Sequence, residues 1–159
     1  EAVSELRGQK VQEENDVQIK VAVDAFIPDT YITKSEDRMV AYKIIAGIKN
    51  DQDKDRVLHD FSEVFGPVPK VVQNLIDVAY IKAKASKLKA ESVVSSLSAF
   101  EIVFDSKDKI IGNEEIGELI YKFRFQCSLD FTNGSKICFK RSKNAEDNFN
   151  LLKEFMKAV

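Results

Sequence analysis

The run Phe65-Gly66-Pro67-Val68-Pro69 limits the fold of this chain more than any other segment. Apolar residues at helical spacing precede it over about residues 54–65 and continue after it. Gly66 stands where a helix ends in a left-handed residue, and Pro67 prevents the helix from continuing. Pro69 suits the first turn of another helix. The sequence therefore predicts a stiff corner between two helices.

A second informative run, Asp24-Ala25-Phe26-Ile27-Pro28-Asp29-Thr30-Tyr31-Ile32, follows an alternating segment. The alternation over residues 17–23 predicts a half-buried strand. Pro28 disfavours a helical conformation of the residue before it, so we expect a short extended loop. Thr33 with Glu36, or alternatively Ser35, would cap the helix that follows. The expected apolar face of this helix consists of Ala41, Ile44, Ile45 and Ile48.

The rest of the chain divides into helices and then strands. The helix over residues 54–65 would bury Val57, Leu58, Phe61, Val64 and Phe65, and the third helix would bury Val72, Leu75, Ile76 and Ala79. After residue 88 we expect strands at 93–97, 100–104 and 123–131, a short helix at 114–121 and a last helix with Phe149, Leu152, Phe155, Met156 and Val159 on one side. The predicted class is α+β: an N-terminal strand and three-helix segment, then a small mixed or antiparallel sheet with a β-hairpin and a C-terminal helix.

The register of the hairpin decides whether the two cysteines, Cys127 and Cys138, can form a disulfide. A three-residue loop at 132–134 pairs Leu129 with Ile137 and Cys127 with Phe139, which keeps the large apolar side chains on one face. Burial of each such side chain stabilises by roughly 1.5–3 kcal/mol and outweighs the turn preference of a two-residue loop. The cysteines then point to opposite faces, and both should be free thiols.

Size and charge limit the function classes. With 159 residues, 44% hydrophobic and 31% charged, the chain suits one folded domain at residues 17–159, preceded at 1–16 by a helix end and a linker. No apolar run approaches the roughly 20 residues that span a bilayer. The net charge of −2 argues against a dedicated nucleic-acid binder. The start lacks an initiator Met and a signal pattern, so we expect a piece of a longer cytoplasmic protein.

Residues for catalysis are hard to find in this sequence. His59 is the single histidine, without the companions that zinc or general-base chemistry requires. No glycine-rich phosphate loop occurs, and neither cysteine lies in a redox motif. Four lysines at positions 82, 84, 87 and 89 divide between two helix faces and lack interleaved aromatics. We therefore predict no catalytic, cofactor-binding or metal-binding residue.

Asp60 and Glu63 are the candidate contact residues. They are three positions apart, so they lie side by side on the helix, away from Leu58 and Phe61. They could be ordinary exposed acids. Alternatively, they form an acidic contact for a partner surface that carries arginines.

The two opening runs, followed in order by Arg38 and Tyr42-Lys43, resemble the C-terminal domain of bacterial transcription-repair coupling factors, which are large ATP-driven DNA translocases. The resemblance covers about residues 17–88, and residues 1–8 resemble the last helix of the motor. It implies a regulatory domain that packs on a UvrB-like N-terminal module with an arginine-rich surface. That packing would mask UvrA recruitment and restrain the motor until RNA polymerase is engaged.

The resemblance also implies which partners belong elsewhere in such a protein. ATP and magnesium are expected only in the motor, and polymerase and DNA are engaged by other domains. An autoinhibitory interaction domain is therefore the favoured function. A small accessory DNA-binding module is the alternative, and a stand-alone enzyme built around His59 is the third possibility.

Overall fold

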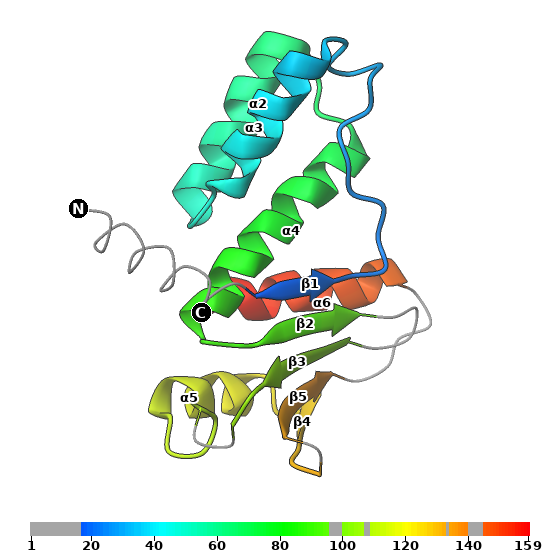
Figure 1. The fold of residues 1–159 in the computed structure, drawn as a ribbon. Coiled ribbons are helices and arrows are strands. Elements are labelled where there is room, and N and C mark those ends of the chain that lie inside the picture. The colour runs from blue at the N-terminus through cyan, green and yellow to red at the C-terminus, as the bar shows by residue number, and fades with distance from the viewer. Residues whose placement is uncertain (1–16, 96–99, 107–108, 133, 140–144) are drawn as a thin grey trace, which may run out of the picture.

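The computed structural model describes residues 17–159 except 96–99, 107–108, 133 and 140–144 (Figure 1). The elements are β1 (Gln18–Lys20), α2 (Ser35–Ala46), α3 (Asp51–Phe65), α4 (Lys70–Lys87), β2 (Ser92–Ser95), β3 (Phe100–Phe104), α5 (Glu114–Lys122), β4 (Cys127–Asp130), β5 (Ser135–Phe139) and α6 (Ala145–Lys157). This arrangement confirms the predicted α+β class. The predicted helix end and linker at 1–16 lie outside the described residues.

The described strands form one mixed sheet in the order β1-β2-β3-β5-β4. β1 pairs in parallel with β2, and the other neighbours are antiparallel. Figure 1 shows α2 and α3 side by side at one end of the molecule and the sheet at the other, with the long helix α4 running between them. One helix therefore joins the helical half to the sheet half.

Aromatic side chains hold α6 against the sheet. Phe100 of β3 and Phe139 of β5 stack with ring centroids 4.3 Å apart. Phe155 of α6 meets Phe139 edge-on at 5.0 Å and lies 5.2 Å from Phe123. Such aromatic pairs contribute roughly 0.5–1.5 kcal/mol each beyond the area that they bury. The predicted apolar side of the last helix is confirmed, because Phe149, Leu152, Phe155 and Met156 are all buried.

The predicted corner lies between α3 and α4. Gly66 has φ 92° and ψ −172°, a region of backbone conformation that is essentially restricted to glycine. Its carbonyl accepts a hydrogen bond of 3.0 Å from the hydroxyl of Tyr31, which also donates to the carbonyl of Phe61 at 3.2 Å. The Tyr31 ring packs edge-on against Phe65 at 5.8 Å. The two runs that dominate the sequence therefore contact each other, and Tyr31 holds the corner.

The extended loop before α2 is held by polar contacts that replace the predicted capping box. The N-cap of α2 is Lys34, whose side chain makes no capping hydrogen bond, so the prediction of Thr33 with Glu36, or Ser35, is wrong. Arg38 instead reaches back and donates to the carbonyls of Ile32 and Thr33 at 2.8 and 3.0 Å. The guanidinium thus satisfies carbonyls before the helix, and this contact stabilises the end of the loop.

Helix α3 begins earlier than predicted because Asn50 caps it. The Asn50 side chain accepts a hydrogen bond of 2.8 Å from the backbone N–H of Asp53, which is typical of an N-cap. The sequence pattern had placed the start near residue 54 because the first turn carries no apolar residue. A polar first turn beside a capping Asn is itself a helix signal.

Two predicted strands are shorter in the structure. The strand expected at 17–23 extends only over Gln18–Lys20. The strand expected at 123–131 begins at Cys127, because the N–H groups of Gln126 and Cys127 both donate to the carbonyl of Phe123. Residues 123–126 therefore form a turn, and Phe125 is 69% exposed.

The hairpin register is confirmed: Cys127 lies opposite Phe139, and Leu129 opposite Ile137. Gly134 has φ 82°, as the predicted left-handed position requires, while Asn133 in the same loop lies outside the described residues. Both cysteines are free thiols.

A carboxylate on α4 joins the two helices on either side of it. Asp77 is 5% exposed, and its Oδ1 lies 2.8 Å from Nζ of Lys54 on α3. Its Oδ2 lies 3.1 Å from Nζ of Lys153 on α6. A single buried group thus links the helical half to the helix that covers the sheet.

We predict that Gly66→Ala destabilises the chain by about 1–3 kcal/mol through backbone strain alone, because an added Cβ at this glycine meets no atom within 4 Å. Chemical unfolding measures the change. Gly117→Ala within α5 is the matched control, since it has equally open space and should stabilise by about 0.5–1 kcal/mol. Equal effects of both substitutions would contradict the assignment of strain to Gly66.

We expect Asp77→Asn to reduce the free energy of unfolding by about 3 kcal/mol, the lower end of the range for breaking a buried ion pair. The lysines moderate the loss, because their side chains are 26% and 24% exposed and can turn to water. Asp105→Asn, which removes an exposed pair with Lys109, should cost less than about 1 kcal/mol. A similar loss in both variants would show that Asp77 is not a special link.

Candidate interaction surface

The predicted contact residues Asp60 and Glu63 lie on the exposed side of α3. Val57 and Phe61, on the opposite side of the helix, are buried in the core. The two carboxylates therefore lie in solvent. Neither carboxylate takes part in a hydrogen bond or ion pair with another described residue. Both acids are therefore available to a partner.

Asp60 borders a groove between α2 and α3. The groove has a volume of about 180 Å³ and is lined by Ile44, Gly47, Ile48, Asp53, Arg56, Val57 and Asp60. Asp53 is already engaged, because it accepts from the backbone N–H of Lys49 at 3.1 Å and lies 3.6 Å from Arg56. The open carboxylate in this groove is that of Asp60.

Large apolar side chains are exposed close to the acidic pair. Ile44, which lines the groove, is 47% exposed, and Val64, one turn after Asp60, is 71% exposed. The prediction that these two residues are buried is wrong. On α2, Met39 and Val40 are also more than half exposed, at 62% and 55%. Exposed apolar residues gathered beside charged ones are typical of protein-interaction surfaces.

A signal for this exposure was present in the sequence. The run Met39-Val40-Ala41-Tyr42 is continuous, so these side chains cannot all lie on one helix face. Only Ala41 and Ile45 of α2 are buried. Helical periodicity correctly predicted that Ala41 and Ile45 face inward. It did not account for the apolar side chains that remain on the outer face.

The other candidates for chemistry lie apart from one another. His59 is exposed, and its backbone carbonyl accepts a hydrogen bond of 2.8 Å from the hydroxyl of Ser62. Lys84 lies over the ring of Tyr80, and the Lys87 ammonium donates to the carbonyl of Val159 at 3.4 Å. These lysines thus serve different contacts and form no single stripe.

The part of the chain that the structure describes offers neither a metal-binding cluster nor a membrane-spanning helix. The described residues hold no group of three or more His, Cys, Asp or Glu side chains that could ligate a metal. Among them, no helix is both long enough and apolar enough to span a bilayer.

The two thiols on the hairpin are less acidic than an ordinary cysteine, because the pKa of each is raised. Burial raises the pKa of Cys127, and burial together with the nearby carboxylates of Glu101 and Asp130 raises the pKa of Cys138. Cys127 Sγ also lies 3.9 Å from the carbonyl of Ile120. The thiolate form, which carries out nucleophilic chemistry, is therefore disfavoured at both positions.

The geometry defines a class of protein: an α+β domain in which a helical hairpin, joined to the sheet by one long helix, presents an acidic and apolar surface. Comparison with known proteins identifies its family. The sequence model of the TRCF domain matches residues 21–114, more than half of the chain. The chain belongs to the TRCF domain family, a domain of transcription-repair coupling factors.

Three of the curated relatives illustrate that the chain resembles part of much longer proteins. The transcription-repair-coupling factor of Borreliella burgdorferi is 26% identical over 121 residues, which is 76% of this chain and 11% of the relative. That of Rickettsia bellii is 30% identical over 97 residues, 58% of this chain and 9% of the relative. That of Bacillus subtilis is 27% identical over 108 residues, 67% of this chain and 9% of the relative. The chain thus spans about a tenth of the length of these relatives.

A solved structure confirms the fold. The crystal structure of the C-terminal domain of transcription-repair coupling factor superposes with a TM-score of 0.78 at 19% sequence identity. The match covers 90% of this chain and 91% of that chain. The arrangement of helices and strands is therefore shared over nearly the whole length.

Because the pKa of both thiols is raised, we predict slow alkylation of Cys127 and Cys138 by iodoacetamide in the native chain at pH 7.5. The rates should increase as the pH rises above the ordinary cysteine value of about 8.5, since more thiolate forms. Mass spectrometry of the labelled peptides measures each rate. Alkylation as fast as that of the urea-unfolded chain at the same pH would contradict the prediction.

Proposed function

We propose that this chain is a non-catalytic, autoinhibitory interaction domain of a longer transcription-repair coupling translocase. In this role it packs on a UvrB-like N-terminal module of the same protein and masks the surface that recruits UvrA. The same contact restrains the ATP-driven motor. The motor holds ATP and magnesium, and other domains engage RNA polymerase and DNA.

The observation that carries the proposal is the acidic pair without partners, Asp60 and Glu63, beside exposed apolar residues on α3 and α2. Carboxylates bind arginine side chains through short, charge-assisted hydrogen bonds that are often bidentate. The exposed Ile44 and Val64 supply apolar area that a partner could bury. A partner surface rich in arginine, such as the one expected on the UvrB-like module, is complementary to this composition.

Rigidity of the surface supports the same function. α3 is held at its start by the ion pair of Lys54 with Asp77 and at its end by the Tyr31 contact with Gly66. A contact surface that keeps its shape binds without a large loss of conformational entropy. The helical hairpin therefore suits a contact that must hold a motor in its resting state.

Charge reversal tests the acidic pair. We predict that Asp60→Arg with Glu63→Arg, in the full-length translocase, raises both UvrA binding and polymerase-independent ATPase activity. Loss of a hydrogen-bonded interfacial charge pair costs about 2–5 kcal/mol. Because 1.4 kcal/mol corresponds to tenfold, the resting state should weaken by at least about tenfold. Pull-down with UvrA and a steady-state ATPase assay without polymerase measure the two effects.

The matched control is Glu115→Arg with Glu118→Arg. These acids are also exposed and three positions apart on a helix, but they lie on α5 in the sheet half. The control removes the same net charge and should leave both activities unchanged. Unchanged activities in the Asp60 and Glu63 variant, or equal increases in the two variants, would contradict the proposed contact.

A further inference from the structure

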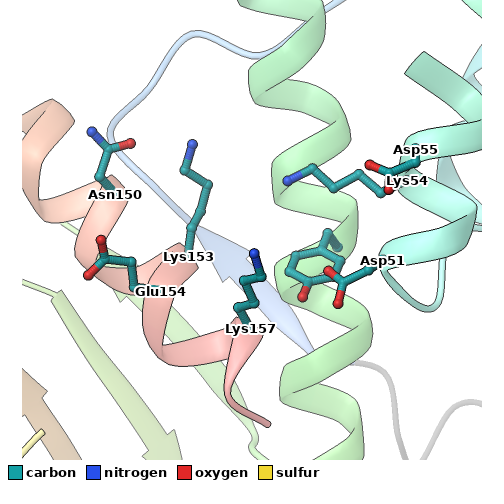
Figure 2. A pocket seen from close by; sticks show the side chains of 8 residues that line it. Asp51, Lys54, Asp55, Asn150, Lys153, Glu154 and Lys157 are labelled. Atoms are coloured by element: carbon teal, nitrogen blue, oxygen red, sulfur yellow. The ribbon is translucent and has the colours of Figure 1, made fainter. Parts of the chain in front are cut away.

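A cavity of about 510 Å³ lies between α3, α4 and α6, and its charges are balanced within the domain. Figure 2 shows side chains of α3 and α6 around it, with α4 between the two helices. Its carboxylates are those of Asp51, Asp55 and Glu154, and its ammonium groups are those of Lys54, Lys153 and Lys157. Asp77 pairs with two of these lysines. Charges that remain for an external partner therefore lie elsewhere on the surface.

A second exposed surface lies in the sheet half of the domain, where α5 leads into β4. Its aromatic side chains, Tyr121 and Phe125, are 68% and 69% exposed. The guanidinium carbon of Arg124 lies 4.3 Å from the centroid of the Tyr121 ring and 4.7 Å from that of the Phe125 ring. Arg124 Nη1 also donates a hydrogen bond of 2.9 Å to the carbonyl of Tyr121. The guanidinium is thus held beside two rings that are both exposed to solvent.

We call Tyr121, Lys122, Arg124 and Phe125 the arginine–aromatic surface. Lys122 and Arg124 are exposed, and neither forms an ion pair with another described residue. The hydrogen bond to Tyr121 uses one N–H group of the guanidinium and leaves the others for a carboxylate. Because the rings already hold the guanidinium, it loses little conformational freedom on binding. Tyr and Arg are among the residue types that most often dominate the binding energy of protein interfaces.

Exposed aromatic rings and cations also occur where proteins bind single-stranded nucleic acid. Three exposed carboxylates, those of Glu114, Glu115 and Glu118, lie on the helix that leads into the arginine–aromatic surface. They repel a strand that carries a phosphate at every nucleotide. A protein surface that places only two carboxylates close together is a better match for two cations.

We propose that the arginine–aromatic surface of one copy of this chain binds the acidic pair, Asp60 and Glu63, of a second copy. Both carboxylates are exposed on α3, without a hydrogen bond or ion pair to another described residue. The two carboxylates of one copy thus match the two cations, Lys122 and Arg124, of the next copy. The guanidinium can bind a carboxylate through two parallel hydrogen bonds, which fixes the orientation of the contact.

Apolar side chains accompany the charges on both surfaces. Ile44 and Val64, near the acidic pair, are 47% and 71% exposed, and the rings of Tyr121 and Phe125 lie beside the cations. Exposed apolar area of this kind is buried when two protein surfaces associate. The two surfaces are therefore opposite in charge and alike in their apolar content.

The two surfaces lie at opposite ends of the domain. Figure 1 shows α2 and α3 at one end and α5 with β4 at the other. A contact between two different surfaces is heterologous, so each copy keeps one unoccupied surface after the first contact. Association by this contact therefore continues past a dimer, unlike association by a twofold contact.

The proposed self-association does not rest on the proposed autoinhibitory function. Both use Asp60 and Glu63, but this chain by itself contains no UvrB-like module. In the full-length protein the module and a second copy would compete for the same two carboxylates. Experiments on this chain alone therefore test the contact between copies, whatever the outcome of the UvrA-binding and ATPase assays.

Sedimentation equilibrium of this chain, from dilute solution to about 1 mM, measures the association, because weak contacts are also populated at that concentration. We expect the average mass to rise past that of a dimer and to fall when salt is added, since salt screens exposed charges. A chain that stays monomeric at every concentration, or that stops at a dimer, would overturn the proposal.

Neutral substitutions identify the two surfaces. Arg124→Gln removes the guanidinium from one surface, and Asp60→Asn with Glu63→Gln neutralises the other. Each variant should self-associate at least about tenfold more weakly, because loss of one partner of an interfacial charge pair has at least this effect. Lys20→Gln on β1 is the control with unchanged association, since Lys20 is exposed at the opposite edge of the sheet from β4. Association of either surface variant as strong as that of the unsubstituted chain contradicts the contact.

Mixing the two surface variants is the most specific test. The Arg124→Gln chain keeps its acidic pair, and the chain with Asp60→Asn and Glu63→Gln keeps its arginine–aromatic surface. An equimolar mixture should therefore form a complex of one copy of each variant and grow no further. The affinity of this complex should equal that of a single contact in the unsubstituted chain. A mixture that stays monomeric shows that the two surfaces do not bind each other.

A single-stranded oligothymidylate distinguishes nucleic acid from a second copy as the partner. We expect the oligonucleotide to leave the average mass of the chain copies unchanged, because the α5 carboxylates repel it. Saturable binding of the oligonucleotide that is lost in Arg124→Gln would overturn the proposal in favour of a nucleic-acid surface.

Discussion

The ion pairs of Asp77 with Lys54 and Lys153 are the interaction on which the arrangement of this domain most depends. They join three helices through one carboxylate that is 5% exposed. Desolvation makes buried charges expensive, and such groups persist where their geometry satisfies both partners. One apolar core runs through both halves, and this carboxylate adds a polar link across α4. The position of α3, and with it the surface that carries Asp60 and Glu63, follows from this connection.

The corner at Gly66 complements that connection at the other end of α3. Tyr31 comes from a loop more than thirty residues earlier in the chain, yet its hydroxyl bonds the Gly66 carbonyl. The two runs with which the sequence analysis began therefore contact each other, and both lie within the residues that the TRCF domain model matches. They shape the helical hairpin, whereas the proposed partner contact lies one turn before the corner.

Sequence reasoning succeeded where burial or backbone conformation allows only one local structure. The hairpin register was predictable because a slip of one residue would expose Ile137 and Phe139 together, although Leu129 opposite Ile137 is itself 39% exposed. The corner was predictable because few residues other than Gly and Pro suit it. Both positions of the acidic pair were predictable from helical periodicity, and the structure places both in solvent. Whether they contact a partner stays a prediction.

The features that the sequence did not predict depend on contacts between residues that are distant in the chain. Asp77 has no local pattern that marks it as buried, and Lys54 and Lys153 are 99 positions apart. The exposure of Ile44 and Val64 depends on how α2 packs against α3, which helical periodicity alone does not determine. The cavity that residues of α3, α4 and α6 line likewise forms only in the folded chain.

Carboxyl footprinting of the full-length resting translocase tests the central claim most directly. A carbodiimide with an amine label modifies exposed carboxylates, and mass spectrometry measures the extent at each residue. We predict that Asp60 and Glu63 are protected in the resting protein and become labelled once polymerase is engaged, while Glu115 and Glu118 are labelled equally in both states. Full labelling of Asp60 and Glu63 in the resting protein would contradict a masked contact at this surface.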